Sequence, residues 1–540
     1  MNSELSSTIQ KRLFCVVAAT LLFGAPALPQ SFTGRIVGAI TDPSGGVVAG
    51  AEVRISNVAT GWSATTRSND VGNYVLTELP RGEYQMEVSS AGFKQFVRRG
   101  IQLSIGQQAR VDVQLEIGSV AESVEVTADA SLLETVDSVL GKVVDNKRIV
   151  ELPLNTRNVF SLLFLTPGVT GSVSTTYGTG FGINGARNSM LDILVDGVST
   201  AHPTVNGFSG NSTFPPVEAI AEFKVMGSNY SAEFGRSNGG LVNVVYKSGS
   251  NQFHGSLFEF LRNSRLDANN FFANRAGIPL GSFKRNQFGA MGNGPIIRNR
   301  TFFLGSYEGL RERSQANTVT TVPTDLQRRG DFSETRIANG SLIRIFDPFS
   351  TRAQGSGFVR DPFPGNVIPQ SIMDAVARNV VRFYPQPNTI TNAVTNVNNF
   401  INTGSRSFDQ NQYDGRIDHN ISGSQRIFGR FSRRTNEDAP PAFFPGDLAV
   451  AEGRIIQGVT QPSASIDYSN TLSPAAVWTV RLGLSRSIFD YNNQGLGFRP
   501  SSLGLPAAID SVVDRQMFPR FGAAGFVNLG GGDHRYSTFN

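Results

Sequence analysis

Residues 183–200 read INGARNSMLDILVDGVST, and residues 215–262 read PPVEAIAEFKVMGSNYSAEFGRSNGGLVNVVYKSGSNQFHGSLFEFLR. In this stretch, short runs of apolar β-forming residues alternate with Gly and Asn, which favour turns. The last run, 252–262, is rich in Phe and Leu but also carries charged side chains. The pattern predicts a small β-rich globular unit that leads into a strand of a different kind.

The composition favours a β-rich protein with exposed aromatic surface. Of the 540 residues, 57 are Gly and 39 are Phe, and only 17% are charged, which is a low charge content for a soluble enzyme. The net charge of +5 is spread along the chain, without a block of Lys or Arg. We therefore expect that the protein binds no nucleic acid.

The N-terminus has the three parts of a secretory signal peptide. A basic pair precedes an apolar run at 13–23 and an A-x-A site at 25–27. Because that run is shorter than the roughly 20 residues that span a bilayer, we expect residues 1–27 to be a cleaved signal peptide rather than an anchor. The only cysteine, Cys15, lies inside this leader, and the four histidines lack a metal-ligand spacing. We expect no disulfide, no metal site and no cofactor.

Residues 33–117 alternate between short strands and turn residues. Tyr84, Met86 and Val88 recur at every second position, with polar residues between them, and this pattern predicts a small β-sandwich. The sequences ITDPSGGVVAGAEV (40–53) and SNDVGNYVLTELPRGEYQMEV (68–88) resemble the carboxypeptidase regulatory-like domain. That resemblance implies a non-catalytic sandwich, which serves either as a periplasmic interaction module or as a structural spacer.

A short segment of strand-forming residues follows the sandwich. It consists of Glu122, Ser123, Val124, Glu125, Val126, Thr127 and Ala128. The segment resembles a TonB box, by which an outer-membrane receptor adds an extended peptide to the sheet edge of the TonB protein. The alternative is a last strand or a plain linker, and we place the segment in a linker at 118–134.

The opening stretch belongs to a domain that we place at 135–250. LPLNTRN (152–158), TPGV (166–169), INGAR (183–187) and ILVDGV (193–198) resemble the plug domain of TonB-dependent receptors. NYSAEFGRS (229–237) and NVVYKSGSNQFHG (243–255) are similar to the Oar-like branch of that family. The plug motif implied by the resemblance comprises Asn184, Gly185, Arg187, Asp196 and Gly197.

Two enzyme-like motifs in this domain are better explained by turns. Residues 180–185 fit G-x-G-x-x-G, but the βαβ context of a nucleotide site is missing. Residues 235–239 fit G-x-S-x-G around Ser237, yet 241–245 reads as a strand, whereas a nucleophile elbow needs a helix there. We therefore predict no catalytic residue and no enzyme.

After residue 250 the pattern is typical of a transmembrane β-barrel. Apolar and aromatic residues alternate with polar and charged ones, as lipid-facing and lumen-facing residues do. A soluble sandwich gives the same alternation, but the signal peptide, the aromatic content and the connections favour the membrane. The strands are predicted at about 252–262, 283–293, 300–311, 410–420, 425–434, 461–472 and 476–490.

The predicted connections are alternately long and short, as in outer-membrane barrels. The longest, 312–409, is expected to be an extracellular loop within a partial barrel at 251–540. The family's barrels have about 22 strands, whereas these residues predict seven, and open strand edges are not viable in lipid. We therefore expect the chain to be a fragment of a longer protein.

The resemblance implies a mainly β protein of the Gram-negative outer membrane that transports a substrate with energy from the TonB system. The sandwich would lie in the periplasm, and the barrel would contact outer-membrane lipid. The substrate stays open: a siderophore, a glycan, a peptide or a protein. From position alone, substrate contacts are expected at 170–182, 200–214 and 312–409. The alternative is an outer-membrane adhesion or glycan-binding protein whose barrel is only an anchor.

Overall fold

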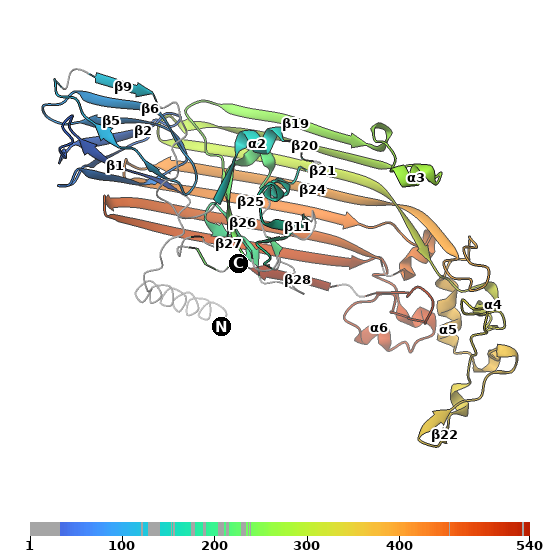
Figure 1. Ribbon diagram of the computed structural model, residues 1–540. Helices are drawn as coiled ribbons and strands as arrows, with labels where there is room; N and C mark the ends of the chain where they lie inside the picture. The colour runs from blue at the N-terminus through green and yellow to red at the C-terminus, as the bar shows by residue number, and fades with distance from the viewer. Residues whose placement is uncertain are drawn as a thin grey trace, which may run out of the picture.

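A computed structural model describes most of the chain and places it in three parts. The described residues are 33–119, 123–127, 141–152, 154, 157–173, 179–186, 191–202, 210–211, 215–227, 230, 234–235, 237, 239–452, 454–531 and 534–539. The parts are a sandwich domain, a plug domain and one long antiparallel sheet, which we call the barrel sheet (Figure 1). The protein is mainly β, as predicted. Within the described ranges no helix is long and apolar enough to cross a membrane, and the predicted signal peptide lies outside them.

The sandwich domain has two sheets, as the alternating pattern predicts. Their orders are β4-β1-β7, with β8 also paired to β1, and β3-β2-β5-β6-β9. The strands are β1 (Gly34–Thr41), β2 (Glu52–Asn57), β3 (Ser63–Arg67), β4 (Asn73–Leu79), β5 (Gly82–Ser89), β6 (Gln95–Leu103), β7 (Gln108–Arg110), β8 (Val113–Gln114) and β9 (Ser123–Thr127). Tyr84, Met86 and Val88 are fully buried in its core. Within the predicted linker, 118–134, the described residues 123–127 form β9, which agrees with the alternative of a last strand.

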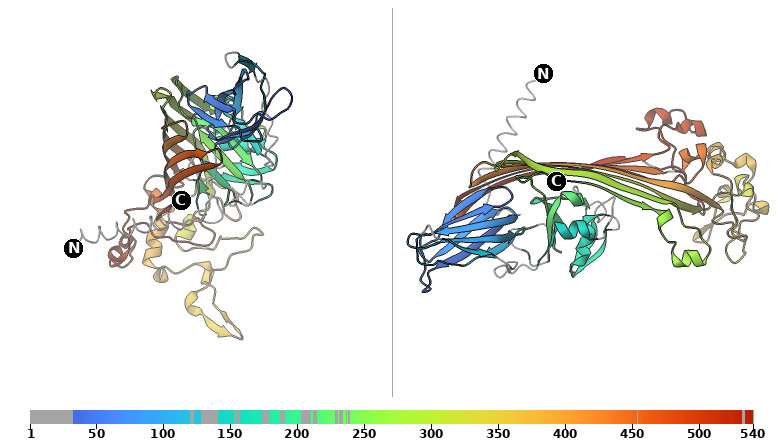
Figure 2. Two further views of the ribbon diagram at one scale, coloured as in Figure 1. Left: turned by 90° about the vertical axis from the view of Figure 1, so that its left-hand side faces the viewer. Right: turned by 90° about the horizontal axis from the view of Figure 1, so that it is seen from above.

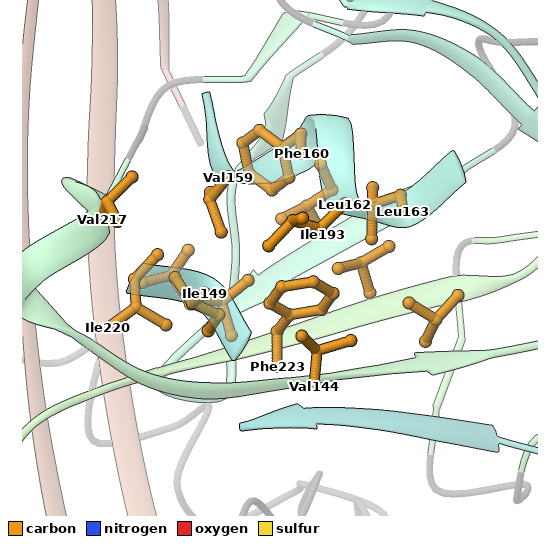
Figure 3. Packing of buried hydrophobic residues seen from close by; sticks show 14 of the residues in the cluster. Val144, Ile149, Val159, Phe160, Leu162, Leu163, Ile193, Val217, Ile220 and Phe223 are labelled. Carbon is orange, nitrogen blue, oxygen red and sulfur yellow. The ribbon is translucent and has the colours of Figure 1, made fainter. Parts of the chain in front are cut away.

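The plug domain is built on a sheet of order β10-β17-β18-β13-β14. Its elements are β10 (Gly141–Asp145), α2 (Asn146–Glu151), η1 (Val159–Leu165), β11 (Val169–Val173), β12 (Thr179–Ile183), β13 (Asp192–Val195), β14 (Val198–Ser199), β15 (Ala201–His202), β16 (Gly210–Asn211), η3 (Val217–Ala219), β17 (Ile220–Met226) and β18 (Leu241–Tyr246). Figure 3 shows Ile149 of α2 and Phe160 and Leu163 of η1 beside Ile193 and Phe223 of the sheet. This core fixes the plug domain as one packed unit.

The barrel sheet has eight antiparallel strands that pair in chain order. They are β19 (His254–Asn263), β20 (Phe283–Ile297), β21 (Thr301–Thr320), β24 (Phe400–Asn420), β25 (Gln425–Ala439), β26 (Ile455–Ser473), β27 (Ala476–Asn493) and β28 (His534–Phe539). Seven of them match the predicted strands. β28 was not predicted from the sequence, and predicted strands such as 300–311 and 410–420 stop short of the backbone ladder between β21 and β24.

The alternation of connection lengths agrees with the prediction. Short turns at 298–300, 421–424 and 474–475 lie at one end, and long connections at 264–282, 321–399, 440–454 and 494–533 lie at the other. The pairing of β21 with β24 runs from Thr301↔His419 to Thr320↔Phe400, so the longest connection is 321–399 rather than the predicted 312–409. The long connections carry η4 (Ser264–Leu266), α3 (Phe271–Arg275), α4 (Asp325–Arg328), η5 (Pro348–Ser350), β22 (Arg352–Gln354), β23 (Gly357–Val359), η6 (Pro364–Asn366), η7 (Gln370–Ile372), α5 (Ala375–Val380), η8 (Val381–Phe383), η9 (Gly446–Ala451), η10 (Pro500–Leu503) and α6 (Ile509–Val512).

The sandwich and plug domains both lie on the concave face of the barrel sheet (Figure 2). The sandwich domain lies at the end with the short turns, and the plug domain lies beside the middle of the strands. The long connections project from the opposite end (Figure 1). This arrangement places the plug domain against the polar side chains of the barrel sheet.

Candidate functional site

The two faces of the barrel sheet are reversed in polarity relative to those of a soluble protein. On β24, Gln412 and Arg416 are buried, whereas Tyr413 and Ile417, which follow them, are about half exposed. The same holds along β27, where Trp478, Leu482 and Leu484 are exposed. The apolar face therefore points outwards, as it does toward lipid, and the polar face points toward the plug domain.

The turn between β13 and β14 is the main contact of the plug domain with this polar face. Asp196 is completely buried at its tip, with a positive φ of 50°. Its carboxylate lies 2.9 Å from Nη1 of Arg416 on β24 and 3.0 Å from Nε of Arg430 on β25. The backbone N–H of Tyr246 also donates to Asp196 Oδ1 at 3.1 Å. One buried carboxylate thus joins two plug strands to two barrel strands.

The next two residues of the turn contact β27. Gly197 has a φ of 76°, and a Cβ there would overlap the guanidinium of Arg481. Arg481 in turn lies 2.8 Å from Asp467 of β26. Val198 occupies the space left by the missing side chain of Gly483. The turn therefore fits the barrel sheet by shape as well as by charge.

Two further plug residues are anchored on the barrel sheet. The hydroxyl of Tyr246 donates to Asp414 Oδ1 of β24 at 2.7 Å, and it lies in a fully buried setting. Arg157 lies 3.1 Å from Glu218 within the plug domain, and its guanidinium stacks 3.7 Å from the ring centre of Phe260 on β19. Arginine suits such a site because a planar guanidinium can pair and stack at once.

The sandwich domain contacts both of the other parts. Ile105 donates its N–H to the carboxylate of Glu222 on β17, and Arg81 Nε lies 3.5 Å from the same group. Burial raises the pKa of Glu222, which lies outside the barrel strands, although these two partners oppose the rise. Trp62 Nε1 donates to the carbonyl of Ser422, in a short turn of the barrel sheet, at 3.2 Å. Ile105, Ala221, Val245 and Phe428 form a shared apolar cluster.

The predicted plug-motif residues differ in their positions and contacts. Asp196 and Gly197 form the contact with the barrel sheet. Asn184 and Gly185 make a left-handed turn after β12, where Asn184 donates its N–H to the carbonyl of Gly168 at 2.9 Å. Arg187 lies outside the described residues. Two members of the predicted motif therefore carry the interface, and two others shape a turn within the plug domain.

The partners of Asp196 were missed by sequence reasoning. Arg416 and Arg430 lie in strands that were predicted to have one polar face, but neither they nor Tyr246 were singled out. A buried carboxylate in a turn requires cationic or hydrogen-bonding partners. The predicted barrel strands carry many arginines on their polar faces, however, and the sequence does not distinguish among them. The sheet register selects the two that meet Asp196.

The TonB-box-like segment is described in part. Ser123, Val124, Glu125, Val126 and Thr127 form β9, whereas Glu122 and Ala128 lie outside the described residues. β9 pairs with β6 in parallel, and Arg99 Nη1 lies 3.2 Å from Glu125. The segment is thus an extended strand at the edge of the sandwich domain.

The two enzyme-like motifs have the structural context of turns. β12, which carries Gly180 and Gly182, forms a hairpin with β11. After Ser237 the chain continues as strand β18, and the Ser237 hydroxyl bonds with Gly240 of the same turn. In the residues around them that the structure describes, neither motif has the strand-to-helix arrangement that its chemistry needs.

The long connections line an open pocket of about 580 Å³ at their end of the barrel sheet. Its lining includes Phe332, Met373, Phe521 and Phe526. Arg328 also borders it, but its guanidinium donates to the carbonyls of Val381 and Tyr384, among others. Of the expected substrate contacts, 312–409 contributes to this pocket through residues between 323 and 384, whereas 170–182 and 200–214 are described only in part.

Three family models match consecutive parts of the chain. Residues 35–116 match the carboxypeptidase regulatory-like domain, 135–242 match the TonB-dependent receptor plug domain, and 245–540 match an outer membrane beta barrel domain. The last of these covers more than half of the chain.

The chain is also similar to the TonB-dependent transporter Oar of Myxococcus xanthus. The two are 30% identical over 309 residues, which are 54% of this chain and 28% of that relative. The chain thus matches little more than a quarter of the curated relative's length.

Two solved structures show a fold likeness. The siderophore receptor PirA from Acinetobacter baumannii is 15% identical, with a TM-score of 0.40 over 75% of this chain and 44% of that one. The outer membrane transporter YddB from Escherichia coli is 13% identical, with a TM-score of 0.43 over 74% of this chain and 44% of that one.

Proposed function

The chain belongs to the TonB-dependent receptors of the Gram-negative outer membrane, and we propose that it acts in TonB-dependent transport. In this function the plug domain blocks a path along the polar face of the barrel sheet. TonB pulls on the segment around β9 and displaces the plug domain. No covalent bond in the substrate changes, which agrees with a family of transporters rather than enzymes.

The contact of Asp196 with Arg416 and Arg430 is the observation that carries this proposal. Ion pairs and hydrogen bonds hold the plug domain, and a pulling force can break and remake them without covalent chemistry. Buried ion pairs gain little stability over apolar packing, so they suit an interface that has to open. The polar face behind them would stay wet when the plug domain moves.

The position of the sandwich domain favours transport over the adhesion alternative. The domain touches the short turn at 421–424 through Trp62, far from the long connections. Short turns of outer-membrane barrels face the periplasm, so we assign the sandwich domain to the periplasm. An adhesion module would have to lie at the other end.

The substrate is not identified by these contacts. The apolar pocket among the long connections is the best candidate for the first contact with the substrate at the cell surface, because it is large and partly enclosed. Siderophores, glycans, peptides and proteins all remain candidates, and loop chemistry rather than the fold decides among them.

A cysteine at Ala221 tests the proposal without a known substrate. Ala221 is fully buried between Ile105 of the sandwich domain and Phe428 of the barrel sheet. The sequence has only Cys15, in the leader, so an Ala221→Cys variant would present one reporter thiol. In cells, a small thiol reagent that does not cross the inner membrane should label it only when TonB and a proton gradient are both present.

The matched control is Ala276→Cys, at an exposed position in the connection 264–282. This thiol should react in every condition. If Ala221→Cys is labelled equally with and without TonB, or never while Ala276→Cys reacts, TonB-driven displacement of the plug domain is wrong.

A further inference from the structure

The segment that TonB would bind is already paired as a strand, β9, of the sandwich domain. β9 pairs with β6 over five residues, from Gln95↔Ser123 to Arg99↔Thr127. It is the last strand in the sheet order β3-β2-β5-β6-β9, and Figure 1 shows it at that edge. The pair of Arg99 and Glu125 adds an ionic contact between the strands. A TonB box must be extended and accessible, whereas this one has a partner on one edge.

The domain that holds the segment is itself fastened to the plug domain. Glu222 of β17 accepts the N–H of Ile105 and lies close to Arg81, as described above. Lys224, two residues further along β17, donates to the carbonyl of Gly106 at 3.4 Å. The sandwich domain therefore contacts β17, the strand of the plug domain that pairs with β10.

The sandwich domain is also fastened to the barrel sheet. Asn251, just before β19, donates its N–H to the carbonyl of Ala59 at 2.9 Å, and Trp62 donates to Ser422. One contact lies just before the first strand of the barrel sheet, and the other lies in the turn between β24 and β25. The sandwich domain thus lies on the periplasmic side of the plug domain and also contacts the barrel sheet.

The chain order gives this arrangement a mechanical consequence. The segment lies between the sandwich domain, which precedes it, and β10, the first strand of the plug domain. β10 is the edge strand of the plug sheet and pairs with β17. A pull on residues 123–127 is therefore resisted first by β6, and only afterwards reaches the plug sheet.

We propose that the sandwich domain is a latch that withholds the TonB-binding segment by holding it as β9. The backbone groups of β9 that pair with β6 are not available to TonB, which can reach them only by displacing β6. Apparent affinity falls in proportion to the fraction of molecules in which β9 is released. Release of β9 also frees the chain toward β10, so that one event exposes the segment and transfers load to the plug domain. This inference rests on the proposed TonB-dependent function.

A disulfide between β6 and β9 tests the latch. Val97 and Glu125 are Cα partners in the register, and the mature sequence offers no competing thiol. The full chain with Val97→Cys and Glu125→Cys, in detergent, would be titrated with the purified periplasmic domain of TonB from the same organism. The oxidised form should bind roughly tenfold more weakly, or worse, than the reduced form of the same protein.

The control disulfide joins two strands of the same sheet that do not include the segment. Arg54 and Glu87 are Cα partners on β2 and β5, and oxidation of Arg54→Cys with Glu87→Cys should leave TonB binding unchanged. Equal binding by the oxidised and reduced forms of the β6–β9 pair would overturn the latch, since TonB would then bind β9 in place. If the unmodified chain does not bind TonB, the proposed function fails and the latch with it.

A charge reversal gives an independent test that needs no disulfide. Arg99→Glu turns the exposed ion pair with Glu125 into a repulsion and weakens the docking of β9. TonB binding should then become about two- to fivefold tighter. Arg67→Glu is the matched control, because Arg67 pairs with Glu52 on the same sheet, 3.7 Å away, without touching β9. Unchanged or weaker binding by Arg99→Glu, with normal binding by the control, contradicts the latch.

Discussion

Asp196 of the plug domain lies 2.9 Å from the guanidinium of Arg416 in the barrel sheet, although 220 residues separate them in the chain. Arg416 is also held by Asp418 at 2.8 Å, and its guanidinium stacks 4.0 Å from the ring centre of Phe428. Arg416 is therefore fixed in place before the plug domain docks. Because both partners are buried, the contact is sensitive to the loss of either charge.

Asp196→Asn should loosen the plug domain while keeping its fold. The amide retains the acceptor for Tyr246 N–H but removes the carboxylate that lies 3.0 Å from Arg430, while Arg416 keeps its pair with Asp418. Breaking a buried ion pair in this way costs roughly 3–5 kcal/mol. The midpoint of urea-induced loss of trypsin resistance, measured on the detergent-solubilised chain, should fall accordingly. Asp145→Asn, at an exposed ion pair with Arg148, should leave the midpoint nearly unchanged.

A double-mutant cycle locates the effect in the pair itself. Asp196→Asn combined with Arg416→Gln should cost clearly less than the sum of the two single substitutions, since contacting residues are not additive. Additive costs would show that the two side chains stabilise the protein independently and would refute the assigned contact.

A methyl group at Gly197 should damage the plug–barrel contact through shape. Gly197 and Gly185 have nearly equal φ values of 76° and 78°, so Ala costs about 1–2 kcal/mol of backbone strain at either position. Only at Gly197 does the new Cβ overlap a neighbour, the guanidinium of Arg481. Gly197→Ala should therefore lower the urea midpoint more than Gly185→Ala, which meets open space. Equal midpoints would mean that Arg481 moves away without cost.

Arg157→Lys should show that stacking, beyond charge, holds the plug domain against β19. Lysine keeps the positive charge near Glu218 but cannot stack its ammonium on Phe260 as a guanidinium does. The expected loss is roughly 1–2 kcal/mol. Arg148→Lys, at a half-exposed site on α2, is the control and should change stability little. If Arg157→Lys is as stable as the parent chain in the same urea titration, the ion pair alone holds this contact.

The sequence predicted the order of the parts because each has a local signature. Alternation identified the sandwich and barrel strands, and the resemblance of 193–198 to the plug domain singled out Asp196. Alternation also placed Arg416 and Arg430 on the polar face, but many other arginines share that face. Which of them meets Asp196 depends on the register of β24 and β25 and on how the plug domain docks, and neither is encoded in neighbouring residues.

The same limit applies to β9. Val124 and Val126 alternate with polar residues and so favour a strand, but the pattern does not name its partner. Pairing with β6 requires the chain to return to the edge of the sandwich sheet after residue 119, which is a long-range contact. The predicted strand ends near 312 and 409 were wrong for a different reason. There the apolar alternation fades while the backbone hydrogen-bond ladder of β21 and β24 continues.

Docking of the sandwich domain onto the plug domain should weaken as pH rises, through Glu222. Burial raises the pKa of this carboxyl above its ordinary value of 4.5, against the opposing effects of Arg81 and the Ile105 N–H, and the charge of Asp145 adds to the rise. A group whose pKa is raised in the docked state contributes stability below its normal pKa and loses that contribution as pH rises through the raised value. The weakening should therefore begin above about pH 4.5.

Trp62 reports this docking because its indole lies between the sandwich domain and the turn at 421–424. The chain has two tryptophans, so Trp478→Phe leaves Trp62 as the only emitter. In that background, the Trp62 emission should shift to the red with rising pH, and Glu222→Gln should remove the shift while keeping the acceptor for Ile105. Glu222→Ala should give the red-shifted emission at every pH, because it leaves that buried N–H unpaired. A pH profile in Glu222→Gln identical to that of the parent would assign the titration to another group.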